Sequence, residues 1–127
     1  MGGEHSAQEW EIALMHRVHS AHDGACTRVL WGELDPGRAD DALSTFRMTV
    51  LPRLEELPGF CSVSVMVDRA TGRCVQAATY DSREEMDRAG ELMASRREEF
   101  SREMGITLTE VAEFDLVVHE LRVPEMA

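Results

Sequence analysis

The sequence predicts an α+β protein in which strands and helices follow one another in the order β-α-β-β-α-β. Two patterns carry this prediction. Apolar residues recur at helical spacing from Leu43 to Leu57, and the hydrophobic period changes to two from Phe60 onward. Leu57-Pro58-Gly59 separates the two patterns, because Pro58 disfavours helical torsions at Leu57 and Gly59 permits a positive φ.

Residues 1–24 are predicted to form an N-terminal extension that is partly helical. Trp10, Leu14 and Val18 are spaced four apart, which is typical of one stripe on a helix. We therefore expect a short helix over residues 7–20, preceding the main domain.

The first half of the main domain is predicted to be a strand and a helix. Residues 25–34 alternate as a strand, and the turn sequence Asp-Pro-Gly-Arg follows at 35–38. A helix is expected over 39–57. Pro52 lies inside it and lacks a backbone donor, so we expect a kink near Met48.

The second half begins with a hairpin of strands at 60–68 and 73–80, joined by a short loop that contains Gly72. A last strand is expected over 109–121. With the intervening helix, these elements give the ferredoxin-like plan, a four-stranded antiparallel sheet with both helices on one face. The other face has no cover within the chain, which predicts a second subunit.

The second helix has signals at both ends. Ser82 and Glu85 form a capping box, in which the serine accepts from the amide of Glu85 and the glutamate reaches back. The helix is expected to end near Met104, because Gly105 suits the left-handed position and Ile106 supplies the usual apolar contact.

Composition narrows the classes of function. The net charge is -11, with 24 acidic and 13 basic residues, so the chain repels phosphate backbones and we predict no nucleic-acid partner. No apolar run is long enough to span a membrane and the N-terminus is polar, so we predict neither a membrane span nor a secretory signal. The three cysteines lack pair spacing, so we predict reduced thiols in a cytoplasmic protein.

Five segments carry a resemblance to a known family: DPGR at 35–38, VLPRL at 50–54, LPGF at 57–60, YDSRE at 80–84 and EFDLV at 113–117. With them the chain resembles the dimeric α/β-barrel superfamily, and within it the antibiotic biosynthesis monooxygenase-like domain. The resemblance covers residues 25–123 and leaves 124–127 as a tail. It implies a homodimer whose two sheets face each other and close into a barrel.

The resemblance also implies a ligand pocket in each subunit. Some members are oxygenases that act on polycyclic phenols without a cofactor, and others degrade heme. The heme-degrading members use an Asn on the first strand and a Trp and a His near the second helix. This chain has no Asn, and its second helix has neither Trp nor His. We therefore predict neither heme degradation nor a cofactor.

Three residues are candidates for catalysis. His119 titrates near neutrality and is the predicted base, while Tyr80 and Arg28 would orient or stabilise a substrate anion. In this plan the first strand lies between the third and the last, so Arg28 is expected to face an acidic residue of the last strand. The alternative is that these residues form structural ion pairs at an interface.

Five further residues are predicted to contact a ligand: Trp31, Ser64, Met66, Gln76 and Asp115. Trp31 and Tyr80 offer aromatic surface with a polar tip, which suits a flat apolar molecule. The predicted function is a homodimeric, monooxygenase-like small-molecule-binding protein that oxidises a phenolic or polyketide-like compound. The alternative is a non-catalytic ligand-binding or dimeric assembly module.

We predict no metal site, although one sequence pattern keeps a metal hypothesis open. His16, His19 and His22 are spaced three apart and would share one side of an N-terminal helix, where they could hold a transition metal. The simpler interpretation is a solvated polar face, because no carboxylate or cysteine nearby in the sequence completes a site.

Overall fold

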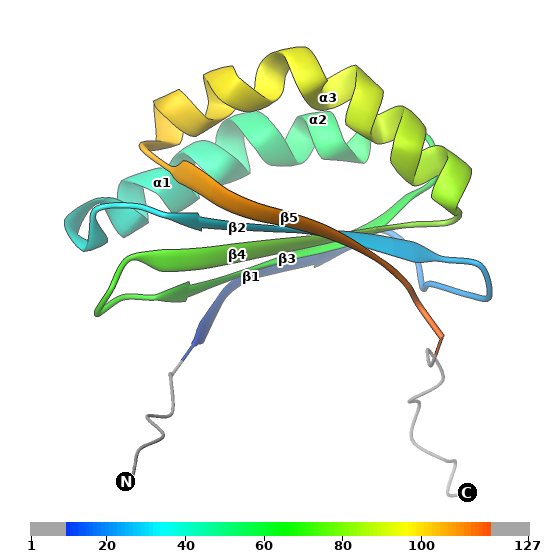
Figure 1. The fold of residues 1–127 in the computed structure, drawn as a ribbon, viewed down its shortest axis with the longest axis horizontal. Helices are drawn as coiled ribbons and strands as arrows, with labels where there is room; N and C mark the ends of the chain where they lie inside the picture. Colours follow the sequence, from blue (N-terminus) through cyan, green and yellow to red (C-terminus); the bar gives the residue numbers. More distant parts are fainter. Residues whose placement is uncertain (1–9, 118–127) are drawn as a thin grey trace, which may run out of the picture.

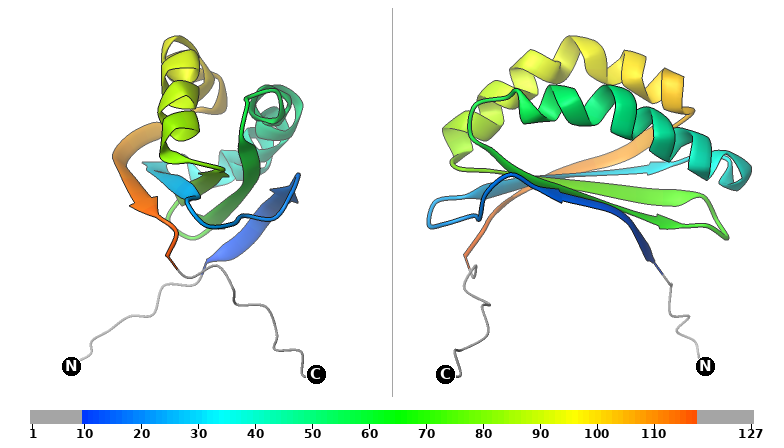
Figure 2. Two further views of the ribbon diagram at one scale, coloured as in Figure 1. Left: turned by 90° about the vertical axis from the view of Figure 1, so that its right-hand side faces the viewer. Right: turned by 180° about the vertical axis from the view of Figure 1, so that it is seen from behind.

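The computed structural model describes residues 10–117. One antiparallel sheet carries all helices on a single face (Figures 1 and 2). Its five strands are β1 (Glu11–Arg17), β2 (Cys26–Glu33), β3 (Phe60–Asp68), β4 (Arg73–Tyr80) and β5 (Thr107–Asp115). The strand order is β1-β3-β4-β2-β5, so β2 lies between β4 and β5 as expected. The α+β, ferredoxin-like plan is confirmed.

The predicted N-terminal helix is wrong. Glu11–Arg17 is a fifth strand, β1, that pairs with β3 through a bulge at Ala13. Pairing with β3 gives hydrogen-bond partners to backbone groups that would be unpaired at the edge of the sheet. These hydrogen bonds stabilise the strand more than a weak helical pattern in a short segment stabilises a helix. Leu14, a member of the predicted helical stripe, is buried against the core from the strand.

The first helical segment runs in four pieces. These are η1 (Pro36–Arg38), α1 (Ala39–Thr45), the π-helical η2 (Phe46–Val50) and α2 (Leu51–Glu55). The kink expected near Met48 is a π-helical turn, the widening that accommodates the missing donor of Pro52. Regular helix ends at Glu55, two residues before the expected end.

The second long helix, α3 (Arg83–Met104), has the predicted ends. The Ser82 hydroxyl oxygen accepts from the amide of Glu85 at 3.1 Å, and the hydroxyl donates to the Glu85 carboxylate at 3.2 Å. Gly105 is left-handed with φ 71°, and the amide of Ile106 donates to the carbonyl of Ser101 at 2.8 Å. The strand that follows starts at Thr107, two residues earlier than expected, and the part predicted beyond residue 117 lies outside the described residues.

The core lies between the helices and one sheet face. The first helical segment contributes Phe46, Val50 and Leu54, which pack in one cluster with Val63 of β3. The helix α3 contributes Met86 and Phe100 to the same cluster. Within residues 10–117, the opposite sheet face carries no helix (Figure 2). We call it the open face. Successive side chains of each strand point alternately to the helix-covered face and to the open face, so every second residue of a strand reaches the core.

Candidate ligand cavity

A cavity of about 120 Å³ lies between the sheet and the helices. Its walls are mostly apolar, with contributions from α1, η2, α2 and α3 and from the strands β2, β3, β4 and β5. Phe46, Met93 and Leu108 are representative of this lining. The volume is close to that of an engineered cavity of about 150 Å³ that accepts benzene. The cavity therefore suits a body about as large as one ring, smaller than a typical drug-sized pocket of about 300 Å³ or more.

Five polar residues belong to this otherwise apolar lining. They are Arg28 on β2, Gln76 and Tyr80 on β4, and Arg97 and Ser101 on α3. Strand register explains the first three, because Arg28 is opposite Ala78, midway between Gln76 and Tyr80, on the helix-covered face. Gly90 of α3 makes room for the Arg28 guanidinium, since a Cβ there would lie within 2.9 Å of three of its atoms.

Charge around the cavity is unbalanced toward positive. The Arg28 guanidinium donates to Glu113 of β5 at 2.8 Å, as its predicted position across the ladder implies. Arg97 has no carboxylate partner among the described residues. Burial lowers the pKa of Arg97, and the like charge of Arg28 lowers it further. Glu113 also accepts from Arg83 at 3.4 Å, so the carboxylate beside Arg28 is shared with a second arginine, although the net charge of the protein is -11.

Tyr80 brings a hydroxyl to the same region. Its ring packs edge-on against Phe60, with centroids 6.0 Å apart, and the residue is almost fully buried. Burial raises the pKa of Tyr80, while the positive charges of Arg28 and Arg97 act in the opposite direction. The phenol is therefore a neutral hydrogen-bond donor at neutral pH.

The predicted site residues divide between the two faces of the sheet. Arg28, Gln76 and Tyr80 line the cavity. Asp115 is on the same face but lies at the end of β5, where it accepts from Arg83 at 2.8 Å and from Cys26 at 3.3 Å. His119 lies outside the described residues.

The other three predicted ligand contacts lie on the open face. Trp31 and Met66 flank Val75 in one row of the register, and Ser64 is opposite Ala77. Within one chain the sheet separates these three residues from Arg28 and Tyr80, so the two groups do not line a common cavity.

Arg97 is not among the site residues predicted from the sequence. A signal was present in the spacing. Arg97 follows Met93 by four residues and Ala89 by eight, which puts it on the stripe of α3 that faces the sheet. Arg96, its neighbour, is exposed.

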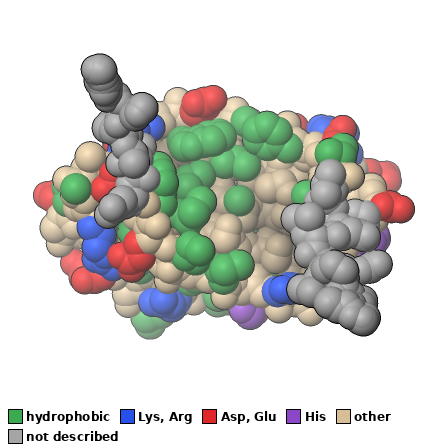
Figure 3. All heavy atoms as spheres, turned by 90° about the horizontal axis from the view of Figure 1, so that it is seen from below, with side chains coloured by type: hydrophobic (Ala, Val, Ile, Leu, Met, Phe, Trp, Pro, Cys, Tyr) green, Lys and Arg blue, Asp and Glu red, His purple; other side chains and the backbone are tan. Residues whose placement is uncertain are grey.

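The open face is apolar over much of its area. Figure 3 shows hydrophobic side chains gathered in the middle of this face. By register its apolar members include Ile12, Met15, Val29, Trp31, Met66 and Phe114. Met15 is 70% exposed, although it sits inside a strand. Large apolar patches of this kind are typical of interaction surfaces.

All three cysteines are free and buried. Burial, together with the neighbouring Asp81 carboxylate, raises the pKa of Cys61 to about 12. Burial also raises the pKa of Cys26 and of Cys74. None of the three is a thiolate nucleophile at neutral pH.

The strand order and the helices on one sheet face define a protein with a ferredoxin-like fold. Its structure is similar to a monooxygenase-like protein from Listeria innocua, with a TM-score of 0.62 and 11% identity over 89% of this chain and 66% of that one. It is also similar to a heme-degrading enzyme from Listeria monocytogenes, with a TM-score of 0.58 and 11% identity over 90% of this chain and 74% of that one. At 11% sequence identity, the similarity to these two structures shows a shared fold.

Two curated relatives from Mycobacterium tuberculosis match along the sequence, and both carry the description uncharacterized protein. Rv2558 is 45% identical over 129 residues, and Rv2557 is 40% identical over 125 residues. Each match covers 98% of this chain but 53% and 56% of the relatives, so the chain spans about half their length. No family model matches the sequence. Within residues 10–117 no helix has both the length and the apolar character needed to cross a membrane.

Proposed function

We propose that this protein binds a small apolar compound, about one aromatic ring in size, that carries a single anionic group. The apolar lining and the volume of about 120 Å³ support the ring-sized body. The observation that carries the proposal is Arg97, a half-buried guanidinium that faces the cavity with no carboxylate partner among the described residues. A carboxylate or phenolate on the ligand supplies the missing partner.

Arg28, Gln76 and Tyr80 add donors around the same anion. Arg28 is held by Glu113, so it presents a fixed guanidinium rather than a mobile one. The neutral Tyr80 phenol and the Gln76 amide donate without adding charge. This arrangement favours the anionic form of a phenol over its neutral form.

If the site is catalytic, the reaction that fits it is oxidation of a single-ring phenol by molecular oxygen. The phenolate delivers electrons to O2, one oxygen atom enters the ring to give a quinone, and the other leaves as water. Arg28 and Arg97 would stabilise the phenolate, and His119, which lies outside the described residues, is the proposed base. Support comes from the monooxygenase-like fold and from the excess positive charge at the cavity.

The proposed assembly is a homodimer formed through the open face. Its support is the apolar composition of a sheet face that no helix covers (Figure 3). A second copy offers the same apolar face, so two sheets can bury each other about a two-fold axis. The same module without catalysis would be a dimeric ligand-binding protein.

The ligand proposal is tested by calorimetric titration with benzoate and with benzamide, which share a ring but differ in charge. We expect benzoate to bind one equivalent per chain and benzamide to bind at least about 10-fold more weakly. Arg97→Gln should weaken benzoate binding by about 10-fold or more, while Arg96→Gln, an exposed change one residue away, should leave it unchanged. Equal affinity for the two compounds, or equal effects of the two variants, would contradict the proposal.

Oxygen consumption separates catalysis from binding. Single-ring phenols without a second hydroxyl, such as phenol itself, should be oxidised with uptake of dissolved oxygen, and Tyr80→Phe should slow that uptake. Benzoate binding without any phenol-dependent uptake would leave the ligand-binding module as the function.

A further inference from the structure

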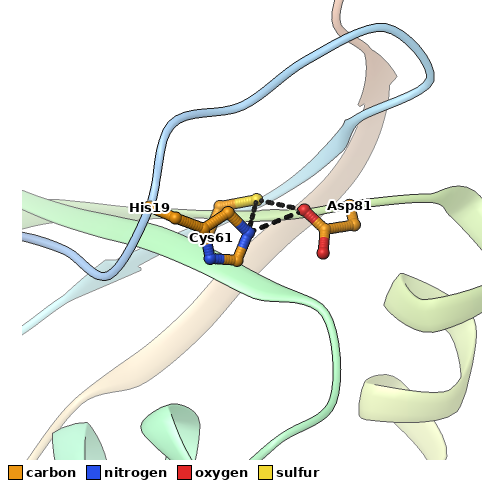
Figure 4. Close-up of side chains that lie close together, drawn as sticks. All are labelled: His19, Cys61 and Asp81. Atoms are coloured by element: carbon orange, nitrogen blue, oxygen red, sulfur yellow. Dashed lines mark hydrogen bonds and ion pairs between the residues drawn. The ribbon is translucent and has the colours of Figure 1, made fainter.

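Three side chains from distant parts of the chain converge beside the sheet (Figure 4). His19 follows β1, Cys61 is the second residue of β3, and Asp81 lies between β4 and α3. The His19 Nε2 atom is 2.8 Å from Asp81 Oδ1 and 3.4 Å from Cys61 Sγ, and Sγ is 3.0 Å from the same Oδ1. One nitrogen, one sulfur and one oxygen therefore face a common point.

This convergence differs from a nucleophilic triad. A Cys-His-Asp relay places the sulfur at one ring nitrogen and the carboxylate at the other, so that the ring passes a proton between them. Here Cys61 and Asp81 approach the same nitrogen, Nε2 of His19. Three potential ligand atoms around one point is the arrangement expected of a metal site.

His22 lies at the edge of the cluster, beside Asp81 and outside the group of three mutually close ligand atoms. Its Nε2 lies 3.6 Å from Asp81 Oδ1. Its Nδ1 is 3.2 Å from the carbonyl oxygen of Asp23, which can only accept, so Nδ1 carries the proton in that hydrogen bond. In a neutral ring Nε2 then keeps its lone pair, which is the tautomer and second-shell bond that metal-binding histidines use.

The backbone holds these residues in place. The amide of Val18 donates to the carbonyl of Cys61 at 2.7 Å, which fixes the residue before His19. The amide of Asp81 donates to the carbonyl of Gly59 at 2.7 Å. Cys61 is 0% exposed, while the His19 side chain is 43% exposed, so the cluster is anchored in the protein and open to solvent on one side.

We propose that His19, Cys61 and Asp81, with His22 as the fourth ligand, form a binding site for Zn²⁺. Bond lengths of about 2.3 Å to sulfur and about 2.0 Å to nitrogen and oxygen give tetrahedral edges of about 3.3–3.6 Å. The three ligand atoms are 2.8–3.4 Å apart, so an ion requires outward shifts of only a few tenths of an ångström. Thiol and imidazole ligands favour Zn²⁺ over Ca²⁺ or Mg²⁺.

The site differs from the three-histidine alternative considered from the sequence. His16 points to the helix-covered side, where its Nε2 lies 2.6 Å from Glu55, so it is not a ligand. The cysteine and the carboxylate that the sequence pattern lacked come from β3 and from the residue after β4. A bound ion would tie the β1–β2 connection to β3 and to the start of α3, which makes the site a structural clamp.

The test uses the full chain, expressed without a polyhistidine tag, with Zn²⁺ and Co²⁺ as probes. We expect one equivalent of Zn²⁺ to remain after gel filtration and to raise the midpoint of thermal unfolding, with reversal by a chelator. Co²⁺ should give a thiolate-to-metal charge-transfer band. His19→Gln should weaken binding by at least about 10-fold.

Matched variants keep the outcome interpretable. The controls are His16→Gln and Cys74→Ala, which remove a histidine and a cysteine that lie outside the proposed site. Both should leave the affinity for Zn²⁺ and the Co²⁺ absorption spectrum unchanged. Cys61→Ala should abolish the charge-transfer band, and if that variant fails to fold, Asp81→Asn and the more exposed His19→Gln carry the test. Less than stoichiometric Zn²⁺ in the parent protein, or a band that survives Cys61→Ala but disappears in Cys74→Ala, would overturn the proposal.

Discussion

Arg28 and Glu113 are direct register partners on β2 and β5, and the Nε and Nη2 atoms of the arginine donate to the same carboxylate oxygen at 3.1 and 2.8 Å. The Arg28 side chain is 14% exposed. The pair fixes one of the two guanidinium groups of the cavity, and it leaves Arg97 as the group available to a ligand.

Replacing Glu113 by Gln should destabilise the protein. The change leaves the largely buried charge of Arg28 near Arg97 without a carboxylate, so we expect a loss of about 1–2 kcal/mol in the free energy of unfolding at pH 7. Glu110→Gln is the control, because Glu110 is exposed on the same strand. Urea unfolding measures both, and equal losses would contradict the role given to the pair.

The same pair predicts a dependence on pH. The hydrogen bond from Arg28 holds the pKa of Glu113 below its ordinary value of 4.5. A carboxyl with a lowered folded pKa stabilises the protein fully above its unfolded pKa, and this stability is lost as pH falls through the folded value. Glu113→Gln should therefore lose less stability than the parent between pH 5 and pH 3. A parallel fall in both proteins would argue against this assignment.

The β3–β4 hairpin requires a glycine at position 72. The φ of Gly72 is 83°, and a Cβ there would overlap the carbonyl oxygen of Leu34. Gly72→Ala should cost more than about 2 kcal/mol of unfolding free energy, because positive φ and steric overlap add. Gly37→Ala, where a Cβ meets only ordinary van der Waals contact, should cost less than about 1 kcal/mol. Thermal and urea unfolding compare the two, and similar midpoints would refute the argument.

Because β1 is a strand, replacing two adjacent residues, Leu14 and Met15, should have different effects on stability. Leu14 is buried in the core cluster, whereas Met15 points to the open face. In the monomer, Leu14→Ala should cost about 2–4 kcal/mol, and Met15→Ala about 0.5 kcal/mol or less. Urea unfolding under dilute conditions measures both. Equal costs would be inconsistent with a strand whose faces alternate.

The proposed homodimer predicts that a charge on the open face separates the subunits. Met15→Arg should convert a dimer to a monomer in sedimentation equilibrium, because a cation would be buried between two apolar sheets. Leu92→Arg is the matched control, since Leu92 is 53% exposed on the helical side. A parent protein that sediments as a monomer, or dissociation by both variants, would count against the open face as the interface.

Local signals predicted most of the fold. The Ser82–Glu85 cap, Gly105 and Pro52 each act within a few residues, so a sequence carries their effect directly. The pairing of Arg28 with an acidic residue followed from the strand order of the plan. The strand β1 was missed because its stability depends on the edge of β3, some 50 residues away, and not on its own period.

The candidate sites show the same limit. Arg97 belonged to a charged run, and only its four-residue spacing from Met93 distinguished it from Arg96. His19, Cys61 and Asp81 are separated by up to 62 residues, so no sequence motif joins them. Their convergence is a product of the β1–β3 pairing that the sequence did not predict.

The central claim is that the cavity holds a ring-sized anion against Arg97. A crystal structure of the protein grown with benzoate tests this most directly. We predict density for the ring between the sheet and α3, with its carboxylate within hydrogen-bond distance of Arg97 and the Tyr80 hydroxyl. An empty cavity at saturating benzoate, or benzoate bound only on the open face, would contradict the account.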